Sequence, residues 1–190
     1  FKQKTAYEIR LSLVGSEMCI RDRIYDDLVY KRGKLAEVHK IQSLNPESIV
    51  KHMDLYMTIM FGKSPLSRAQ REMIAVVVSV ANSCRYCQIH HSQALNNYWK
   101  DDDRINSLKR DFSKTNLSST DLLLCELAWQ LTRTPNISTE SIINKLKGGN
   151  IEDRAVLDAT LVIAYFNFVN RLVLGLGVEL EEGDGAGYKY

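Results

Sequence analysis

Signals that begin and end α-helices recur along the chain from Ile24 onward, and no segment shows the sustained polar–apolar alternation of a half-buried strand. This pattern predicts an all-α fold. Gly175 and Gly177 are expected to close the last helix, because glycine readily adopts the left-handed conformation that follows many helix ends. The expected helices cover residues 32–42, 46 to about 60, 68 to about 81, 84–99, 101–112, about 120 to 131, 139 to about 147, and 151–174.

Several of these helices start at side chains that accept hydrogen bonds from N–H groups of the first turn. Ser67 with Gln70 forms a capping-box pattern, and Asn45 precedes a proline at a first helical position. Ser83 is expected to cap the helix that begins at Cys84. Later caps are expected at Ser119 or Thr120 and at Ser138.

The chain has 190 residues, of which 45% are hydrophobic and 25% charged, which is typical of a globular domain with a sizeable core. Residues 1–23 resemble the translation of a sequencing adapter and are expected to be a non-native extension. Residues 24–65 are expected to form an N-terminal helical region. Residues 66–178 are expected to form the core, and residues 179–190 an exposed tail.

The charge balance argues against a nucleic-acid or membrane partner. The chain has 25 Lys and Arg against 23 Asp and Glu, and without residues 1–23 the balance is 20 against 20. Such a chain has no basic excess with which to bind phosphate groups. The longest apolar stretches, residues 73–78 and 161–166, are much shorter than a bilayer-spanning helix requires.

The four cysteines are too few and too unevenly spaced for a disulfide scaffold, so a reducing cytoplasm is the expected compartment. Two of them form a compact motif with a histidine. On a helix, Cys84, Cys87 and His91 fall within a sector of roughly 60°, so their side chains can touch. Such thiols can form a disulfide, and the imidazole can exchange a proton with either sulfur. A position at a helix start favours thiolate over thiol.

Glu72 is a candidate fourth member of this cluster. On one unbroken helix it would point about 120° away from Cys84. A break at Asn82-Ser83 would let the second helix turn back, so that the carboxylate could face His91. Glu72 could equally serve only to stabilise a helix start, and the sequence leaves both interpretations open.

With eleven, two and three intervening residues, Glu72, Cys84, Cys87 and His91 reproduce the active-site signature of AhpD-like alkylhydroperoxidases. These proteins belong to the carboxymuconolactone decarboxylase superfamily. The chain resembles the peroxidase-related branch of that superfamily over most of its length. The passages that carry this resemblance are residues 66–95, 165–170 and 175–177.

The resemblance implies an AhpD-like helical bundle that assembles into homo-oligomers and acts as a thiol-dependent peroxidase. It implies that Cys87 attacks the hydroperoxide, that Cys84 resolves the product as a disulfide, and that His91 with Glu72 relays protons. No cofactor or metal is expected, and the electron donor is expected to be a thiol or lipoyl-type reductant. Tyr86 stands where the best-known members have a second histidine of the relay. His90 could partly substitute for that histidine.

Alternative functions remain open. A redox sensor or disulfide-exchange protein would keep the disulfide without peroxide turnover. Zinc could bind both thiols and His91 with Glu72 as fourth ligand, although structural zinc sites usually combine two separated ligand pairs. A thioredoxin-like protein would need a βαβ unit, and c-type haem attachment would need histidine where Gln88 stands. A decarboxylase would leave the thiols without a role.

Three other conspicuous side chains are expected to be structural. Cys125 lies within an apolar run and is interpreted as a small buried hydrophobic residue. His39 and His52 lie in amphipathic segments and are expected to be packing or surface residues.

Overall fold

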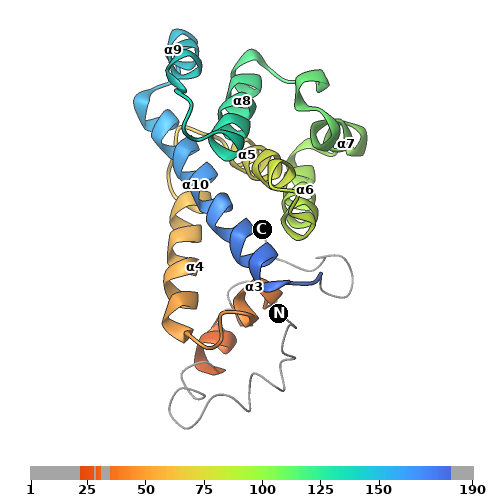
Figure 1. Ribbon diagram of the computed structural model, residues 1–190, viewed down its shortest axis with the longest axis vertical. Coiled ribbons are helices and arrows are strands. Elements are labelled where there is room, and N and C mark those ends of the chain that lie inside the picture. The colour runs from red at the N-terminus through yellow and green to blue at the C-terminus, as the bar shows by residue number, and fades with distance from the viewer. Residues whose placement is uncertain (1–21, 28, 31–34, 181–190) are drawn as a thin grey trace. The chain divides into compact units, whose positions relative to one another are not determined.

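The computed structural model describes residues 22–27, 29–30 and 35–180, and all regular structure in these ranges is helical (Figure 1). The all-α prediction is therefore confirmed for the described part of the chain. Residues 1–21 and 181–190, on which most of the predicted extension and tail fall, lie outside it. The helices are α3 (Glu37–Lys40), α4 (Pro46–Phe61), α5 (Arg68–Ala81), α6 (Arg85–Trp99), α7 (Asp102–Arg110), the 3₁₀ helix η1 (Phe112–Lys114), α8 (Ser119–Arg133), α9 (Glu140–Gly148) and α10 (Asp153–Leu176).

The chain divides into two compact units. One is continuous and runs from Thr58 to Asn170, and the other comprises the described residues before and after it. All the candidate site residues lie in the continuous unit. The boundaries predicted at residues 65 and 178 stay a prediction.

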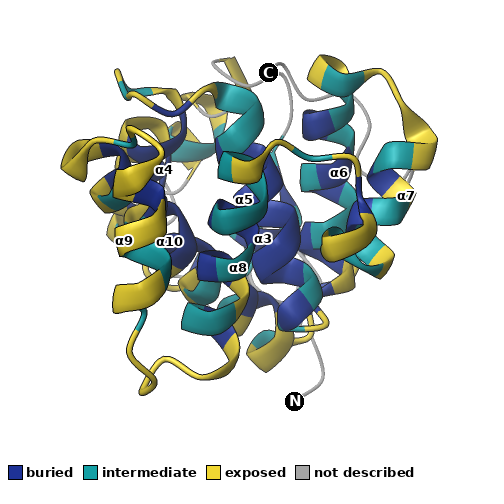
Figure 2. Cartoon of the chain, turned by 90° about the horizontal axis from the view of Figure 1, so that it is seen from above, coloured by how far each residue is buried: buried dark blue, intermediate teal, exposed yellow. Residues whose placement is uncertain are grey.

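Helix α5 is the centre of the continuous unit, where it contacts α6, α7 and α8. Every residue from Arg71 to Ser79 is buried, and Figure 2 shows α5 largely in the colour of buried residues. The predicted capping box is present, with Ser67 Oγ accepting from Gln70 N–H and the Gln70 side chain accepting from Ser67 N–H. Gln70 also donates to Asp121 at 2.9 Å, which ties the start of α5 to α8. Residues 73–78 are apolar around the whole circumference of α5 and are all buried, as expected for the middle of a core helix.

The turn between α5 and α6 corrects the predicted cap. Ser83 has φ 57° and its N–H bonds to the Val80 carbonyl, while the Cys84 N–H bonds to the Ser79 carbonyl at 2.9 Å. These are the two hydrogen bonds of a Schellman motif, so Ser83 ends α5 and does not cap α6. Cys84 itself takes the N-cap position, and α6 begins one residue later than predicted. Because the turn is so short, α6 follows α5 immediately.

Two other helix starts also differ from prediction by one residue or more. Helix α8 is capped by Ser118, whose Oγ accepts from Asp121 N–H at 3.1 Å. The residue before α9 is Thr139, which makes no side-chain capping bond, whereas the predicted Ser138 accepts from Glu140 N–H at 3.3 Å. Asp101 does cap α7, by accepting from Arg104 N–H. In the first case, a serine upstream of both predicted candidates already satisfies the first-turn donors.

Helix α10 runs through Gly175, which does not end it as predicted, and stops at Leu176. Gly177 follows with φ +65°, the left-handed conformation expected of it. Among the described residues, α10 is long and apolar enough by length and composition to cross a membrane. Its most apolar window is 44% buried, and the core helix of a soluble protein passes the same test. The short apolar stretches noted in the sequence therefore understate the apolar length of this helix.

In the other unit, α3 and the start of α4 are joined through Gln42, which donates to the Val38 carbonyl at 2.7 Å and lies 2.8 Å from His52 Nδ1. The His52 ring contacts the His39 ring edge to face. Burial lowers the pKa of His52 to about 4. His52 is thus a packing residue, as the sequence indicated.

Candidate active site

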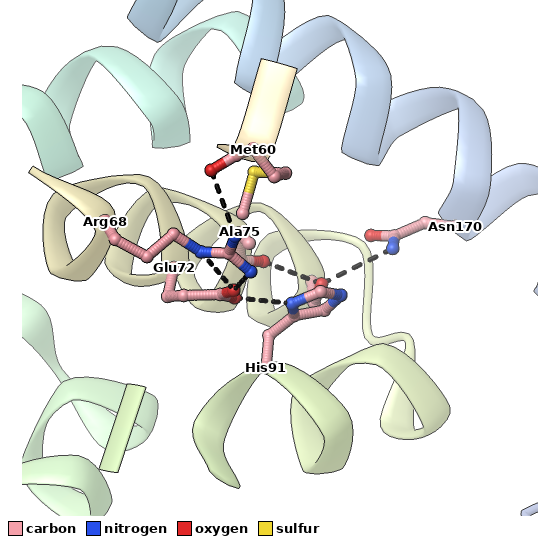
Figure 3. A network of polar contacts seen from close by, with 7 residues as sticks. Met60, Arg68, Glu72, Ala75, His91 and Asn170 are labelled. Carbon is pink, nitrogen blue, oxygen red and sulfur yellow. Dashed lines mark hydrogen bonds and ion pairs between the residues drawn. The ribbon is translucent and has the colours of Figure 1, made fainter. Parts of the chain in front are cut away.

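The turn between α5 and α6 brings Glu72 and His91 together. His91 Nδ1 lies 2.7 Å from Glu72 Oε2, and the Glu72 side chain is fully buried (Figure 3). This contact joins residues on two different helices. Of the two interpretations left open by the sequence, the structure therefore favours the one in which Glu72 faces the histidine.

Arg68 holds the other oxygen of the Glu72 carboxylate. Its Nε donates to Glu72 Oε1 at 3.0 Å, and its Nη2 forms an ion pair with the same oxygen. Its Nη1 donates to the Met60 carbonyl at 3.0 Å (Figure 3). The guanidinium lies 3.6 Å from the centre of the Phe61 ring. Arg68 was not among the predicted site residues. The one signal for it was the four-residue spacing between the arginine and the glutamate, which is common on helix surfaces.

Two opposed effects set the charge of Glu72. Burial by itself raises its pKa, but the contacts with His91 and Arg68 outweigh this, and the pKa lies below its ordinary value. Glu72 is therefore an ionised carboxylate in the core, held by two cationic or hydrogen-bonding partners. A buried charge of this kind is stable only when it is paired and hydrogen-bonded.

Cys84 and Cys87 are free thiols, with exposed fractions of 0% and 2%. A hydrogen bond from the Cys87 thiol lowers the pKa of Cys84, against the effect of burial, and the backbone N–H of Cys87 lowers it further. The pKa of Cys87 is raised by the same sulfur–sulfur hydrogen bond, by burial and by the charge on Cys84. The lowered pKa expected at a helix start is therefore found at Cys84 and not at Cys87, which is buried and donates the shared hydrogen bond.

His91 packs against aromatic side chains of α10. The His91 ring meets the Phe166 ring edge to face at 4.4 Å between centroids, and the Phe166 ring in turn packs against Tyr165. Tyr86 and His90 are both buried, and their rings lie 4.4 Å apart. A part in proton relay for His90 stays a prediction.

A second polar group reaches the thiols from α10. The Asn170 side chain, labelled in Figure 3, is fully buried and donates to Ser79 Oγ at 3.4 Å. A side-chain hydrogen bond from Asn170 also acts on Cys87 and lowers the pKa of that thiol. The passage around Asn170 carries part of the family resemblance, but its sequence indicates no role for the asparagine. Its spacing from the cysteine motif carries no local signal, because the contact depends on how α10 packs on α5.

Within the described ranges, no group of three or more His, Cys, Asp or Glu side chains is arranged to hold a metal ion. Both oxygens of Glu72 are engaged, one by Arg68 and one by His91. Cys125, by contrast, is a buried thiol away from the motif, and burial raises its pKa, as expected of a small hydrophobic residue. The catalytic roles assigned to Glu72, to the two motif cysteines and to His91 stay predictions.

Comparisons with known proteins show a family match and a shared fold. Residues 50–110 match the carboxymuconolactone decarboxylase family. An uncharacterized peroxidase-related protein from Silicibacter sp. TM1040 is 25% identical, with a TM-score of 0.84 over 100% of this chain and 99% of that one. No curated protein matches the chain in sequence.

Two further solved structures share the fold. A protein from Ralstonia eutropha JMP134, described as an alkylhydroperoxidase AhpD core and uncharacterized peroxidase-related protein, is 20% identical, with a TM-score of 0.80 over 97% of this chain and 93% of that one. The debrominase Bmp8, solved with 2,3,4-tribromopyrrole, is 17% identical, with a TM-score of 0.74 over 92% of each chain. Residues 50–110 therefore resemble the carboxymuconolactone decarboxylase family, and the described chain has the fold of AhpD-like, peroxidase-related proteins.

Proposed function

We propose that the protein is a thiol-dependent peroxidase that reduces hydroperoxides through a Cys84–Cys87 disulfide. The observation that carries the proposal is a buried pair of hydrogen-bonded thiols on the same helix as His91, which contacts the buried Glu72 carboxylate, in an AhpD-like fold. Thiolate is the nucleophile for peroxide oxygen, and a neighbouring acid–base pair supplies the proton that the leaving oxygen needs.

The reaction has three balanced steps. Cys87 thiolate attacks the terminal oxygen of ROOH, the O–O bond breaks, and a proton converts RO⁻ into ROH, which leaves a sulfenic acid. The Cys84 thiol then attacks the Cys87 sulfur and releases water as the disulfide forms. Two thiols of a small-molecule or lipoyl-type donor reduce the disulfide and become a disulfide themselves. The net reaction consumes ROOH and two donor thiols, and yields ROH, water and the donor disulfide.

In this scheme the Glu72–His91 pair handles the proton. His91 gives a proton to the departing alkoxide and takes one from the pair of thiols before the next cycle. Glu72 orients the imidazole through Nδ1, and Arg68 fixes the carboxylate from its other side. The role of the carboxylate resembles that of the acidic residue that orients histidine in hydrolase triads.

The test follows peroxide consumption by the purified protein with several electron donors, including a lipoylated one. We expect saturable turnover in the wild type and none in Cys87→Ser. Cys84→Ser should react once and stop as a sulfenic acid at Cys87. Cys125→Ala removes a third buried thiol away from the motif and is expected to keep turnover. Full turnover in Cys87→Ser would contradict the proposal.

A redox sensor is the second candidate, and the near-complete burial of both sulfurs favours it, since burial limits the access of substrate. A sensor would consume one equivalent of peroxide per subunit and then stop, with every donor tested. We also propose a cytoplasmic protein that forms homo-oligomers. The reduced thiol pair supports a cytoplasmic location, and the exposed apolar face of α10 supports a homo-oligomer.

A further inference from the structure

We propose that Asn170 is a catalytic residue of the peroxidase reaction: its amide donates one N–H to Cys87 Sγ and draws negative charge onto the sulfur that attacks the hydroperoxide. This inference rests on the proposed function and assigns a role to the α10 passage that the cysteine motif leaves unused.

The orientation of the Asn170 amide is fixed by two other asparagines. Asn82 Nδ2 donates to Asn170 Oδ1 and to Asn167 Oδ1, each at 3.0 Å. Asn167 Nδ2 donates in turn to Thr132 Oγ1 and to the Ile163 carbonyl, each at 3.0 Å. A flipped Asn170 amide would place its NH₂ group against the NH₂ group of Asn82. The network therefore directs the Asn170 nitrogen away from Asn82 and toward the thiols.

The two N–H groups of Asn170 then have two acceptors. Ser79 Oγ donates its own hydrogen to the Ala75 carbonyl at 2.7 Å, so toward Asn170 it acts as an acceptor, at 3.4 Å (Figure 3). The second acceptor is Cys87 Sγ. Asn170 is fully buried, so water does not compete for either N–H group. Because each N–H group of Asn170 has its own acceptor, the amide is held in one orientation, with the positive end of its dipole toward the sulfur.

This dipole acts against the raised pKa of Cys87 in the reduced pair of thiols. The hydrogen bond with Cys84, together with burial, raises the pKa of Cys87, and the amide of Asn170 acts in the opposite direction. When one proton is lost from the pair, the remaining proton lies between the sulfurs. An N–H donor on Cys87 stabilises the arrangement in which the charge is on Cys87. That thiolate attacks ROOH, the O–O bond breaks, and the products after uptake of one proton are the Cys87 sulfenic acid and ROH.

Asn170→Asp, made in a Cys84→Ser background, leaves one motif thiol to titrate and replaces the N–H donor by a group of the same shape. We expect the pH profile of Cys87 alkylation to move to higher pH and sulfenic acid formation at neutral pH to slow roughly 10- to 100-fold, as for loss of a hydrogen bond to a charged group. Asn167→Asp is the matched control, one turn away in the same network but without a bond to the sulfur. Asn167→Asp should change the rate of sulfenic acid formation by less than about threefold. This is well below the rate change expected when a hydrogen bond to a charged group is lost.

The alkylation profile does not involve peroxide, so it tests Asn170 even if the wild type shows no peroxide turnover. An unchanged profile in Asn170→Asp would overturn the inference. If that variant does not fold, the side-chain amide resonances of the wild-type protein supply the answer. The Asn170 NH₂ signals should shift with the same pH midpoint as thiol ionisation, and those of Asn167 should shift much less. Asn170 NH₂ signals that do not shift as the thiol ionises would also overturn the inference.

Discussion

Glu72 is the residue on which the electrostatics of the site depend. It is an ionised carboxylate with no solvent exposure, and its two oxygens are divided between Arg68 and His91. Replacing a buried ion pair as a whole can be neutral, but removing one partner leaves a charge in the core without compensation. The arginine is held by the Met60 carbonyl and the Phe61 ring, so it cannot easily swing out to water.

We expect Glu72→Gln to lower the free energy of unfolding at pH 7 by roughly 3 kcal/mol, because the variant loses the ion pair with Arg68 and the charged hydrogen bond with His91. Since the folded-state pKa of Glu72 lies below its ordinary value, its stabilisation is complete above the unfolded pKa of about 4.3 and is lost as pH falls through the lower folded value. The wild type should lose stability in this acid range by more than Glu72→Gln does.

Urea unfolding measured from pH 7 down to acid pH tests this expectation. Glu47→Gln is the control, because Glu47 is an exposed carboxylate in the first turn of α4. Its curve should run parallel to that of the wild type. If the Glu72→Gln curve also ran parallel, the carboxylate would not carry the pH dependence assigned to it.

At the scale of the elements, the junction of α5 and α6 decides where the thiols lie. Ser83 ends α5 in a left-handed conformation, and Cys84 begins α6 as its N-cap. The Cys84 N–H is bound by the Ser79 carbonyl, which also accepts from Gln88 at 3.2 Å. One carbonyl of α5 therefore anchors both the first thiol and the first turn of α6. This fixes the direction in which α6 leaves and sets His91 opposite the glutamate.

We predict that Ser83→Gly stabilises the protein by about 0.5–1 kcal/mol, because glycine adopts a positive φ without a steric cost. Ser83→Val should destabilise it by about 1–2 kcal/mol, because a branched side chain fits this region poorly. Chemical denaturation of both variants measures the two changes. The opposite signs at one exposed position separate backbone strain from loss of a side-chain contact. Equal effects of the two variants would contradict the Schellman turn.

At the scale of the whole molecule, α10 has two different faces. Asn167, Asn170 and Phe166 on one side belong to the site and its support. Leu157 and Leu161 are 53% and 41% exposed, as is Phe168 at 46%, and their spacing of four and seven residues sets them along one line of the helix. A contiguous exposed apolar face of this kind often marks an interface with another protein chain.

We expect this face of α10 to pack against a second copy of the chain. Light scattering coupled to size exclusion should show an oligomer for the wild type and a smaller species for Leu161→Glu. Ile137→Glu places the same charge on an equally exposed apolar residue outside α10 and should leave the oligomer intact. A monomeric wild type, or dissociation by both substitutions, would contradict this expectation.

The helical architecture was predictable because its signals are local. The capping box at Ser67, the proline at the first position of α4 and the left-handed Gly177 each act within one or two turns of backbone, and all three are found where expected. The spacing of Cys84 and Cys87 likewise guarantees their proximity, since one helical turn separates them. The error at the start of α8 arose because neighbouring hydroxyl side chains could each have formed the cap. The error at Ser83 arose because this residue takes the left-handed conformation that ends α5.

Only the tertiary structure decided how these local pieces become a site. Glu72 faces His91 because the short turn after α5 aims α6 back across it, and the spacing of the two residues left that direction open. Asn170 meets Cys87 because α10 packs on α5, a contact between segments far apart in the chain. Which sulfur holds the charge depends on burial and on donors from other helices. Capping and helical spacing are properties of neighbouring residues, whereas desolvation and distant hydrogen bonds exist only once the core has formed.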